Sequence, residues 1–225
     1  MANEASGAVA PGSTAVIMLS GGLDSTVALW WARSNNIEVL PISIEFGGRP
    51  RGELAAVELI AGAAKVGPVW RMPLPFVRLA AQLPAYKDPK RPFPLGYIPL
   101  RNLLFYTLAA YHADAHGARY VVGGHLKEDS MEFPDATPAY FDEMNSLFRR
   151  STDGFNRSGA PEVLLPLVGM TKTEVVRLGA ELGAPFELTW SCWVDGQSPC
   201  GKCIACKDRA EAFEKAGLRD ASLKE

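Results

Sequence analysis

The sequence predicts an α/β fold in which a mostly parallel sheet carries helices on both faces. Two observations predict the sheet: short apolar runs alternate with helical patterns along the 225 residues, and glycine-rich or polar turns follow several of these runs. A third observation, four cysteines confined to residues 192–206, predicts a small metal-binding segment after that domain. A chain of this length suits one α/β domain with such an appendage.

Five apolar runs are predicted to be strands, and the segments between them are predicted to be helices. The predicted strands are residues 14–19, 37–44, 69–74, 119–122 and 163–167. The predicted helices are residues 26–33, 52–65, 100–115, 138–150, 172–182 and 207–216. Pro41 interrupts the second run, which predicts an edge strand or a bulge there, because proline cannot donate to a ladder.

Two segments are predicted to lie outside this regular structure. Residues 1–12 are small and polar to neutral, and we expect a flexible N-terminal tail. The stretch 73–99 contains seven prolines, which predicts a loop or a lid rather than a core element.

Composition and charge favour a small-molecule ligand over a nucleic acid. Hydrophobic residues make up 48% of the chain, which is enough for a packed core. The net charge is −2, whereas a domain that grips nucleic-acid phosphates usually carries a basic excess. No apolar run approaches the ~20 residues that span a bilayer, and the N-terminus does not have the pattern of a secretory signal. We therefore expect a cytoplasmic protein with no direct nucleic-acid or membrane partner.

A glycine-rich turn joins the first predicted strand to the first predicted helix, with the sequence Ser20-Gly21-Gly22-Leu23-Asp24-Ser25-Thr26. Two glycines permit a tight turn and a close approach of the backbone to a ligand. The hydroxyls of Ser25 and Thr26 are expected to face outward at a helix start, which is a favourable place for an anion. The turn has neither the lysine of a Walker A loop nor a G-x-G-x-x-G pattern. The alternative is an ordinary Gly-Gly turn with a capping side chain.

The four cysteines have the spacing of a metal site. Cys200, Cys203 and Cys206 follow two C-x₂-C steps, and Cys192 precedes them by a loop of seven intervening residues. Four thiolates suit tetrahedral zinc, and a site without an open position is expected to be structural. An iron–sulfur cluster and a C-x₂-C redox pair are the alternatives.

The first loop is similar to the pyrophosphatase loop (PP-loop) of the ATP pyrophosphatases, which cleave ATP between its α and β phosphates. Together with the cysteine spacing, it makes the chain resemble the 7-cyano-7-deazaguanine synthase (QueC) family of queuosine and archaeosine biosynthesis. The resemblance covers about residues 13–217. Further motifs that carry it are Ile98-Pro99-Leu100-Arg101-Asn102, Gly123-Gly124-His125, Glu128-Asp129-Ser130, Phe133-Pro134-Asp135, Thr171-Lys172-Thr173-Glu174 and Leu188-Thr189-Trp190-Ser191-Cys192.

This resemblance implies a Rossmann-like PP-loop domain of the adenine nucleotide alpha hydrolase type over residues 13–185. A zinc-binding segment over residues 186–225 would follow. It also implies an ATP-dependent carbon–nitrogen ligase that converts 7-carboxy-7-deazaguanine and ammonia into 7-cyano-7-deazaguanine. One adenylation would lead to an amide, and a second, at the amide oxygen, to the nitrile. The implied cofactors are ATP, Mg²⁺ and structural Zn²⁺.

The implied site residues follow from the matched motifs. ATP is expected to contact the loop Ser20, Gly21, Gly22, Leu23, Asp24, Ser25 and Thr26. The expected catalytic residues are Asp24, which would organise Mg²⁺, Ser25, and Lys172, which would neutralise charge on departing pyrophosphate. The expected substrate contacts are Arg101, Asn102, His125, Asp129 and Asp135. The expected zinc ligands are Cys192, Cys200, Cys203 and Cys206.

Each residue of the substrate set also has a structural interpretation. Arg101 suits a carboxylate or phosphate, or it is a surface arginine beside an asparagine cap. Asp135 could accept hydrogen bonds from a guanine-like edge, or it is a turn residue. His125 is a ligand contact or a packing residue at a strand end. The family usually has Asp-Tyr-Gly-Gln where this chain has residues 45–48, and residues 125–136 also depart from its pattern, so the substrate is less defined than the adenylation machinery.

Three other expectations concern tryptophan and histidine side chains. Trp30 and Trp31 are predicted to be core residues. His112 and His116 are four residues apart on a helix and are predicted to be surface residues rather than metal ligands. Trp190 and Trp193 flank Cys192, where packing and contact with a flat base are both open.

Two other functions stay open from the sequence. One is a related enzyme that adenylates a similar carboxylate and passes it to a sulfur donor or a protein amine. The other is a zinc-ribbon nucleic-acid module on a degenerate nucleotide fold, against which the acidic pI near 6.0 and the intact loop both speak. A homodimer is an open expectation.

Overall fold

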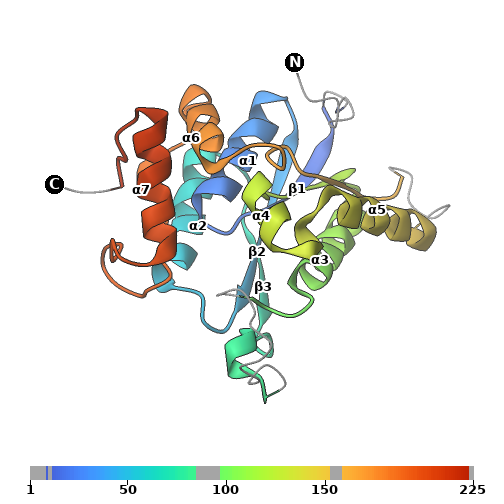
Figure 1. The fold of residues 1–225 in the computed structure, drawn as a ribbon. Coiled ribbons are helices and arrows are strands. Elements are labelled where there is room, and N and C mark those ends of the chain that lie inside the picture. Colours follow the sequence, from blue (N-terminus) through green and yellow to red (C-terminus); the bar gives the residue numbers. More distant parts are fainter. Residues whose placement is uncertain (1–8, 10–11, 85–96, 153–158, 223–225) are drawn as a thin grey trace.

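The computed structural model describes residues 9, 12–84, 97–152 and 159–222, and it contains one parallel sheet (Figure 1). Its five strands have the order β3-β2-β1-β4-β5, and every neighbouring pair is parallel. The strands are β1 (Thr14–Met18), β2 (Glu38–Phe46), β3 (Trp70–Leu74), β4 (Tyr120–Val122) and β5 (Glu162–Leu164). The predicted fold class is therefore confirmed.

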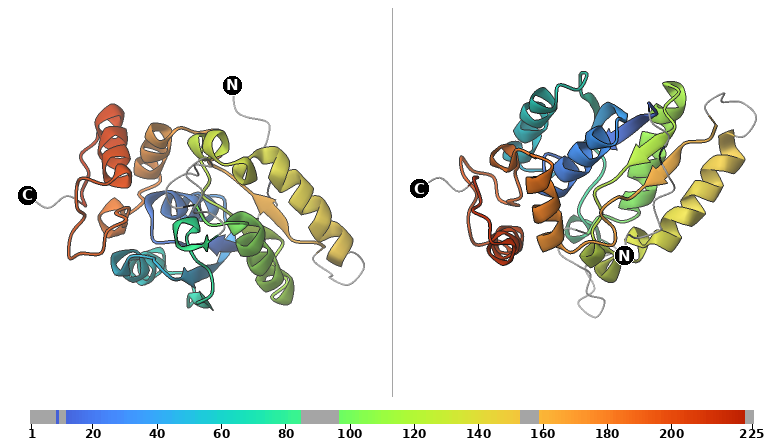
Figure 2. Two further views of the ribbon diagram at one scale, coloured as in Figure 1. Left: turned by 60° about the horizontal axis from the view of Figure 1, so that its bottom comes forward. Right: turned by 90° about the horizontal axis from the view of Figure 1, so that it is seen from above.

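Helices cover both faces of this sheet, which the two views of Figure 2 show as three layers. One face carries α1 (Leu23–Ser34), α2 (Arg51–Ala64), α6 (Lys172–Glu181) and α7 (Ile204–Ala216). The other face carries α3 (Arg101–Ala115) and α5 (Pro138–Thr152). A short helix that the sequence did not predict, α4 (Lys127–Glu132), follows β4.

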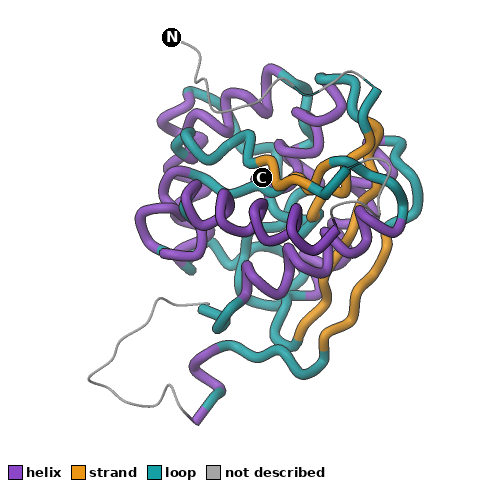
Figure 3. The backbone as a smooth tube through the Cα atoms, turned by 90° about the vertical axis from the view of Figure 1, so that its right-hand side faces the viewer, coloured by secondary structure: helices purple, strands orange, loops and turns teal. Residues whose placement is uncertain are grey.

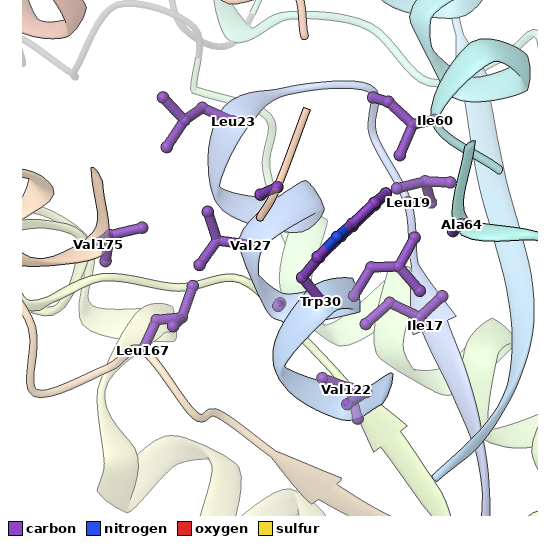
Figure 4. Close-up of a cluster of buried hydrophobic side chains, with 14 of the residues drawn as sticks. Ile17, Leu19, Leu23, Val27, Trp30, Ile60, Ala64, Val122, Leu167 and Val175 are labelled. Atoms are coloured by element: carbon purple, nitrogen blue, oxygen red, sulfur yellow. The ribbon is translucent and has the colours of Figure 1, made fainter. Parts of the chain in front are cut away.

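The core beneath α1 explains the spacing of its apolar residues. Leu23, Val27 and Trp30 recur at helical spacing and belong to the same buried cluster as Ile17 of β1 and Ile60 of α2 (Figure 4). The indole of Trp30 is buried, as predicted, and Trp31 is half-buried and packs against the same cluster. This core fixes the start of α1 against β1, and with it the turn that joins them.

Pro41 does not lie in an edge strand, because β2 is the second strand of the sheet. The carbonyl of Ile42 accepts from Leu19, so Ile42 faces β1 and the nitrogen of Pro41 faces the β3 side. Pairing with β3 begins only at Ile42, opposite Trp70. A donor is therefore not needed at Pro41, and a proline fits inside an inner strand.

The strand order places a switch point between β1 and β4. The chain runs from β1 to β2 and β3 on one side, then returns to β4 on the other side of β1. Ligands of open α/β sheets bind at the carboxyl ends of the strands at such a point. The predicted phosphate loop follows β1, and Gly123-Gly124-His125 follows β4.

His112 is not a surface residue, contrary to the prediction for the two histidines of α3. Its side chain is 7% exposed and its ring stacks on Trp70 at a centroid distance of 3.9 Å. Burial lowers the pKa of His112 to about 4. His116, at the exposed end of the helix, agrees with the prediction.

The predicted N-terminal tail lies outside the described residues except for Val9 and Gly12. Of the proline-rich stretch, residues 85–96 also lie outside them. The described part includes the end of β3 and a helical turn, Ala80–Gln82. Figures 1 and 3 show this turn beyond the end of β3. No helix in the described ranges is long and apolar enough to cross a membrane.

Candidate active site at the switch point

The phosphate loop, Ser20 to Thr26, turns sharply between β1 and α1. Gly21 has a φ of +86°, and a Cβ at this position would overlap the backbone oxygen of Glu53 in α2. Only glycine fits both constraints. The loop is also approached from β4, since a Cβ on Gly124 would lie 2.9 Å from the backbone nitrogen of Ser25.

The hydroxyls of this loop are bonded within the loop and do not face outward as predicted. Ser25 Oγ donates to the Gly22 carbonyl at 3.1 Å and lies 2.9 Å from Ser20 Oγ. Thr26 Oγ1 donates to the Gly22 carbonyl at 2.8 Å. Both residues are buried, because α1 begins at Leu23, three residues earlier than predicted. A hydroxyl in the first turn can then bond back to the preceding backbone.

Asp24 and Lys172 meet across the site although 148 residues separate them. Lys172 Nζ lies 2.6 Å from Asp24 Oδ1 and 2.5 Å from Oδ2, and both side chains are about one quarter exposed. Asp24 is in the first turn of α1, and Lys172 is the first residue of α6. The structure thus brings together two of the three predicted catalytic residues, at the starts of two helices.

The start of α6 is held in place by side-chain caps. Thr171 and Glu174 form a capping box, with Thr171 N donating to Glu174 Oε2 at 2.7 Å. The backbone nitrogen of Lys172 donates to Glu128 Oε1 of α4 at 3.1 Å. The first residue of α6 is therefore fixed, and its side chain reaches Asp24 in the first turn of α1.

The predicted substrate contacts lie together around the start of α3. Asn102 is buried and donates its amide to the backbone oxygen of Asp135 at 2.8 Å. The guanidinium of Arg101 lies over the ring of Phe133, 5.6 Å from its centroid. Asp129 Oδ2 accepts from the backbone nitrogen of Leu126 at 2.8 Å and so caps α4. Asn102 and Asp129 thus each have a structural bond in addition to any contact with a ligand.

His125 lies at the centre of this cluster. Its ring stacks near Tyr106 at a centroid distance of 5.7 Å and lies 5.3 Å from Phe141. Burial lowers the pKa of His125 to about 4, and the charge of Arg101 adds to this effect, while Asp135 and Asp24 oppose it. The imidazole is therefore neutral at pH 7, and its 3.9 Å approach to Asp129 is not an ion pair.

The four cysteines converge as predicted. Their sulfur atoms all lie within 4.8 Å of one another, and Cys203 Sγ is 3.9 Å from Cys192 Sγ. Backbone amides point at these sulfurs: Val194 N and Cys200 N each lie 3.3 Å from Cys192 Sγ. Bonds from the backbone nitrogens of Lys202 and Cys203 lower the pKa of Cys200 to about 6. Such donors stabilise thiolates, so this cluster could bind a metal ion.

Two residues next to the phosphate loop were missed from the sequence. The side chain of Arg49 is buried and donates to the Ser20 carbonyl, and the backbone nitrogen of Trp190 donates to the Gly21 carbonyl at 2.9 Å. The sequence marks neither role. Arg49 stands beside a second arginine, Arg51, in a polar stretch, and Trp190 was weighed for packing or base contact.

A parallel sheet with this loop at its switch point defines a nucleotide-binding protein of the PP-loop type. Solved structures of similar fold agree. One is the NMN synthetase from Francisella tularensis, with a TM-score of 0.51 and 14% identity over 93% of this chain and 79% of that one. Another is a 4-thiouridine synthetase solved with RNA and bound ATP, with a TM-score of 0.53 and 18% identity over 91% of this chain and 53% of that one. At these identities the likeness concerns the fold alone.

The chain belongs to the QueC family, because residues 14–217 match the family model described as "Queuosine biosynthesis protein QueC". It is 37% identical to the 7-cyano-7-deazaguanine synthase of Thermosynechococcus vestitus, over 92% of this chain and 93% of that protein. It is 34% identical to the synthase of the same name from Methanothrix thermoacetophila, over 92% of this chain and 96% of that protein.

Proposed function

We propose that the chain is an ATP-dependent ligase that converts 7-carboxy-7-deazaguanine and ammonia into 7-cyano-7-deazaguanine. The observation that carries this proposal is the glycine-rich loop at the β1–β4 switch point, with Lys172 brought to Asp24 from α6. Membership of the QueC family supports the choice of substrate and product. The loop would bind the phosphates of ATP, and the residues around His125 would bind the deazaguanine.

The chemistry requires activation of a poor electrophile twice. Carboxylate oxygen attacks the α-phosphorus of ATP and displaces pyrophosphate, which gives an acyl-adenylate. Ammonia displaces AMP and loses a proton, which gives the amide. The amide oxygen then attacks the α-phosphorus of a second ATP and displaces pyrophosphate, and loss of AMP and two protons gives the nitrile. Both adenylations build charge on departing pyrophosphate, so one phosphate site serves both.

The residues of the phosphate loop and Lys172 would have different roles in the two adenylations. The first turn of α1 would hold pyrophosphate through its free amides. Lys172 would neutralise the developing charge, released from Asp24 as the phosphates arrive. The Asp24 carboxylate is an oxygen ligand of the kind Mg²⁺ prefers, and this ion would supply further charge neutralisation on the phosphates. We assign Ser25 a different role from the one predicted, because its hydroxyl bonds to Gly22 and shapes the loop.

The residues of the substrate side would recognise the base. Arg101 would attract the carboxylate of the acid, since a guanidinium suits bidentate contact. A neutral His125 can both donate and accept a hydrogen bond, and its ring lies beside Tyr106. Asn102, Asp129 and Asp135 would fix this wall through the backbone bonds described above.

We further infer that the four cysteines bind zinc. A tetrahedral site with Zn–S bonds of about 2.3 Å requires sulfurs about 3.8 Å apart, close to the 3.9 Å between Cys203 and Cys192. An iron–sulfur cluster would share the four thiolates among two or four irons and so spread the sulfurs more widely. The site is closed, so zinc would stabilise the segment and take no part in the reaction. Four thiols without a disulfide also suit a reducing cytoplasm.

One incubation tests the proposal. The protein is mixed with ATP, Mg²⁺, ammonium and 7-carboxy-7-deazaguanine, and the product is followed by mass spectrometry. We expect AMP, pyrophosphate and the nitrile, with the amide appearing first. AMP formation with an amide that is never converted would instead support the related enzyme that hands its adenylate to another acceptor. The absence of AMP with this acid would overturn the proposal.

A further inference from the structure

Arg49 connects the phosphate loop to two elements of the sheet domain. Its side chain is 4% exposed, and its Nε lies 3.1 Å from Glu53 Oε2 in the first turn of α2. Nη1 donates to the Ile44 carbonyl of β2 at 2.6 Å and to Ser43 Oγ at 3.3 Å. Nη2 donates to the Ser20 carbonyl of the loop. One guanidinium thus joins β2, α2 and the loop.

These bonds fix the direction of the loop's backbone donors. A trans peptide is planar, and its carbonyl and amide point to opposite sides. Because Arg49 holds the Ser20 carbonyl, the amide of Gly21 points away from Arg49. Trp190 N holds the next carbonyl, that of Gly21, so the amide of Gly22 points away from Trp190 and donates to Ser20 Oγ at 3.1 Å. Two successive carbonyls are therefore held by donors outside the loop.

The position requires arginine rather than a cation in general. A guanidinium presents its N–H groups as a rigid fork, which reaches the Ile44 and Ser20 carbonyls at once, whereas an ammonium is a single point charge. The charge is compensated locally: burial raises the pKa of Glu53, and the charge and hydrogen bond of Arg49 oppose that rise. Arg49 does not need the ligand to stay in place, so it is suited to shaping the loop before ATP binds.

We propose that Arg49 is a positioning residue that holds Ser20, Gly21 and Gly22 in the shape that binds phosphate, opposite the anchor from Trp190. This inference rests on the proposed function, because the ligand it concerns is the pyrophosphate part of ATP. Arg49 acts through the loop and does not touch the ligand. Without it, the loop must order when ATP binds, and this ordering lowers affinity.

The test is Arg49→Lys, which keeps a cation beside Glu53 and loses the fork. Calorimetry measures the Kd of Mg-ATP and of Mg-pyrophosphate without the acid substrate, while thermal unfolding and metal content are followed in the same samples. We expect both Kd values to rise about 10- to 100-fold, since a misplaced binding group of this kind costs up to about 10²-fold. The KM for the acid at saturating ATP should stay within about two-fold of the original value.

Arg71→Lys is the matched control. Arg71 also pairs with two carboxylates, Glu45 at 2.6 Å and Glu58 at 2.7 Å, but it is half exposed and lies on β3 away from the loop. The Kd values of Arg71→Lys for Mg-ATP and for Mg-pyrophosphate should be unchanged. Glu53→Gln, which leaves the Arg49 fork in place, serves as a second variant and should weaken binding less than Arg49→Lys.

The outcomes separate this inference from the proposed function. If the unaltered protein does not bind ATP, the proposed function fails. If it binds ATP and folded Arg49→Lys binds with the same Kd, Arg49 is a structural residue and the positioning role is overturned. A lower unfolding temperature with unchanged Kd values overturns that role as well.

Discussion

The two sides of the candidate site at the β1–β4 switch point are built in different ways. On the phosphate side, seven consecutive residues form the loop, and their hydroxyls bond to one another and to the Gly22 carbonyl. On the substrate side, the polar groups come from the start of α3, the end of β4, α4 and the turn Pro134–Ala136. The loop is one local segment whose backbone is held by Arg49 and Trp190, whereas the second side is assembled from four separate elements.

This difference separates chemistry that is common to a fold from chemistry that is particular to one substrate. Phosphate is the same in every ATP, so a compact loop with fixed amides can serve many relatives. The base and the carboxylate of the acid substrate require side chains that are each positioned separately, here around a neutral His125. Changes on the phosphate side should therefore abolish both adenylations, while changes on the substrate side should alter affinity for the acid.

The largest effect is expected from Cys203→Ser, which tests how far the phosphate side depends on the C-terminal segment. Structural zinc can contribute about 10 kcal/mol or more of binding energy coupled to folding. The variant should lose its metal, unfold at a much lower temperature and weaken ATP binding, because Trp190 is two residues from Cys192 and holds Gly21. Elemental analysis and calorimetry measure this, with Ser198→Ala in the same loop as control. Iron with sulfide in the purified protein, or a stable active protein without metal, would contradict the zinc assignment.

The second largest effect is expected from Asp24→Asn, which removes the negative charge from the loop but keeps the shape of the side chain. AMP formation should fall by at least about 10³-fold, since the carboxylate is placed to organise both Mg²⁺ and Lys172. Steady-state assays with a check of the unfolding temperature measure this. Asp195→Asn, an exposed residue that pairs with exposed Arg51, is the control and should keep full activity. Normal turnover in folded Asp24→Asn would remove the loop side from the mechanism.

Lys172→Ala should slow conversion of the acid and of supplied amide by similar factors, about 10²–10³ each. The reason is that charge builds on pyrophosphate in both steps, whichever oxygen attacks. Single-turnover assays started from the acid or from the amide compare the two. Lys127→Ala, at the exposed start of α4, is the control. A loss confined to the first step would mean that the two adenylations use different groups.

The sequence predicted the loop side better than its surroundings, for a physical reason. Alternating apolar runs and the glycine turn are local signals, so the sheet, the loop and the four cysteines could all be expected. The predicted outward orientation of the Ser25 and Thr26 hydroxyls was wrong, because it depends on where α1 starts. The helix begins at Leu23, and the apolar pattern did not mark this first turn. The prediction of an edge strand or a bulge at Pro41 was wrong, because the cost of a proline in a strand depends on which neighbouring strand its nitrogen faces.

Arg49 and Arg51 show the limit most directly. They lie two residues apart in a polar stretch that gives neither a distinct signal, yet their side chains are 4% and 89% exposed. The two arginines differ because Arg49 donates to the Ser20 carbonyl, which is 29 residues away in the chain. Arg49 acts through a long-range contact with the backbone and belongs to no motif, whereas the residues around His125 lie in motifs that could be recognised from the sequence.

The smallest expected effect distinguishes His125 from His112 by pH. The pKa of His125 and that of His112 are both lowered to about 4, mainly by burial, from an unfolded value near 6.5. Between these values the unfolded chain binds more protons, so stability is full above about pH 6.5 and falls as pH drops toward 4, by about 3 kcal/mol per histidine at most. His125→Gln and His112→Gln should each flatten the slope of unfolding free energy against pH in this window, as denaturant titrations would measure. The KM for the acid at pH 7 should rise only in His125→Gln, because His112 packs on Trp70 at the start of β3, whereas the candidate site lies at the carboxyl ends of the strands. An equal rise in KM in both variants would mean that His125 supports the fold in the way His112 does, and that the substrate wall lies elsewhere.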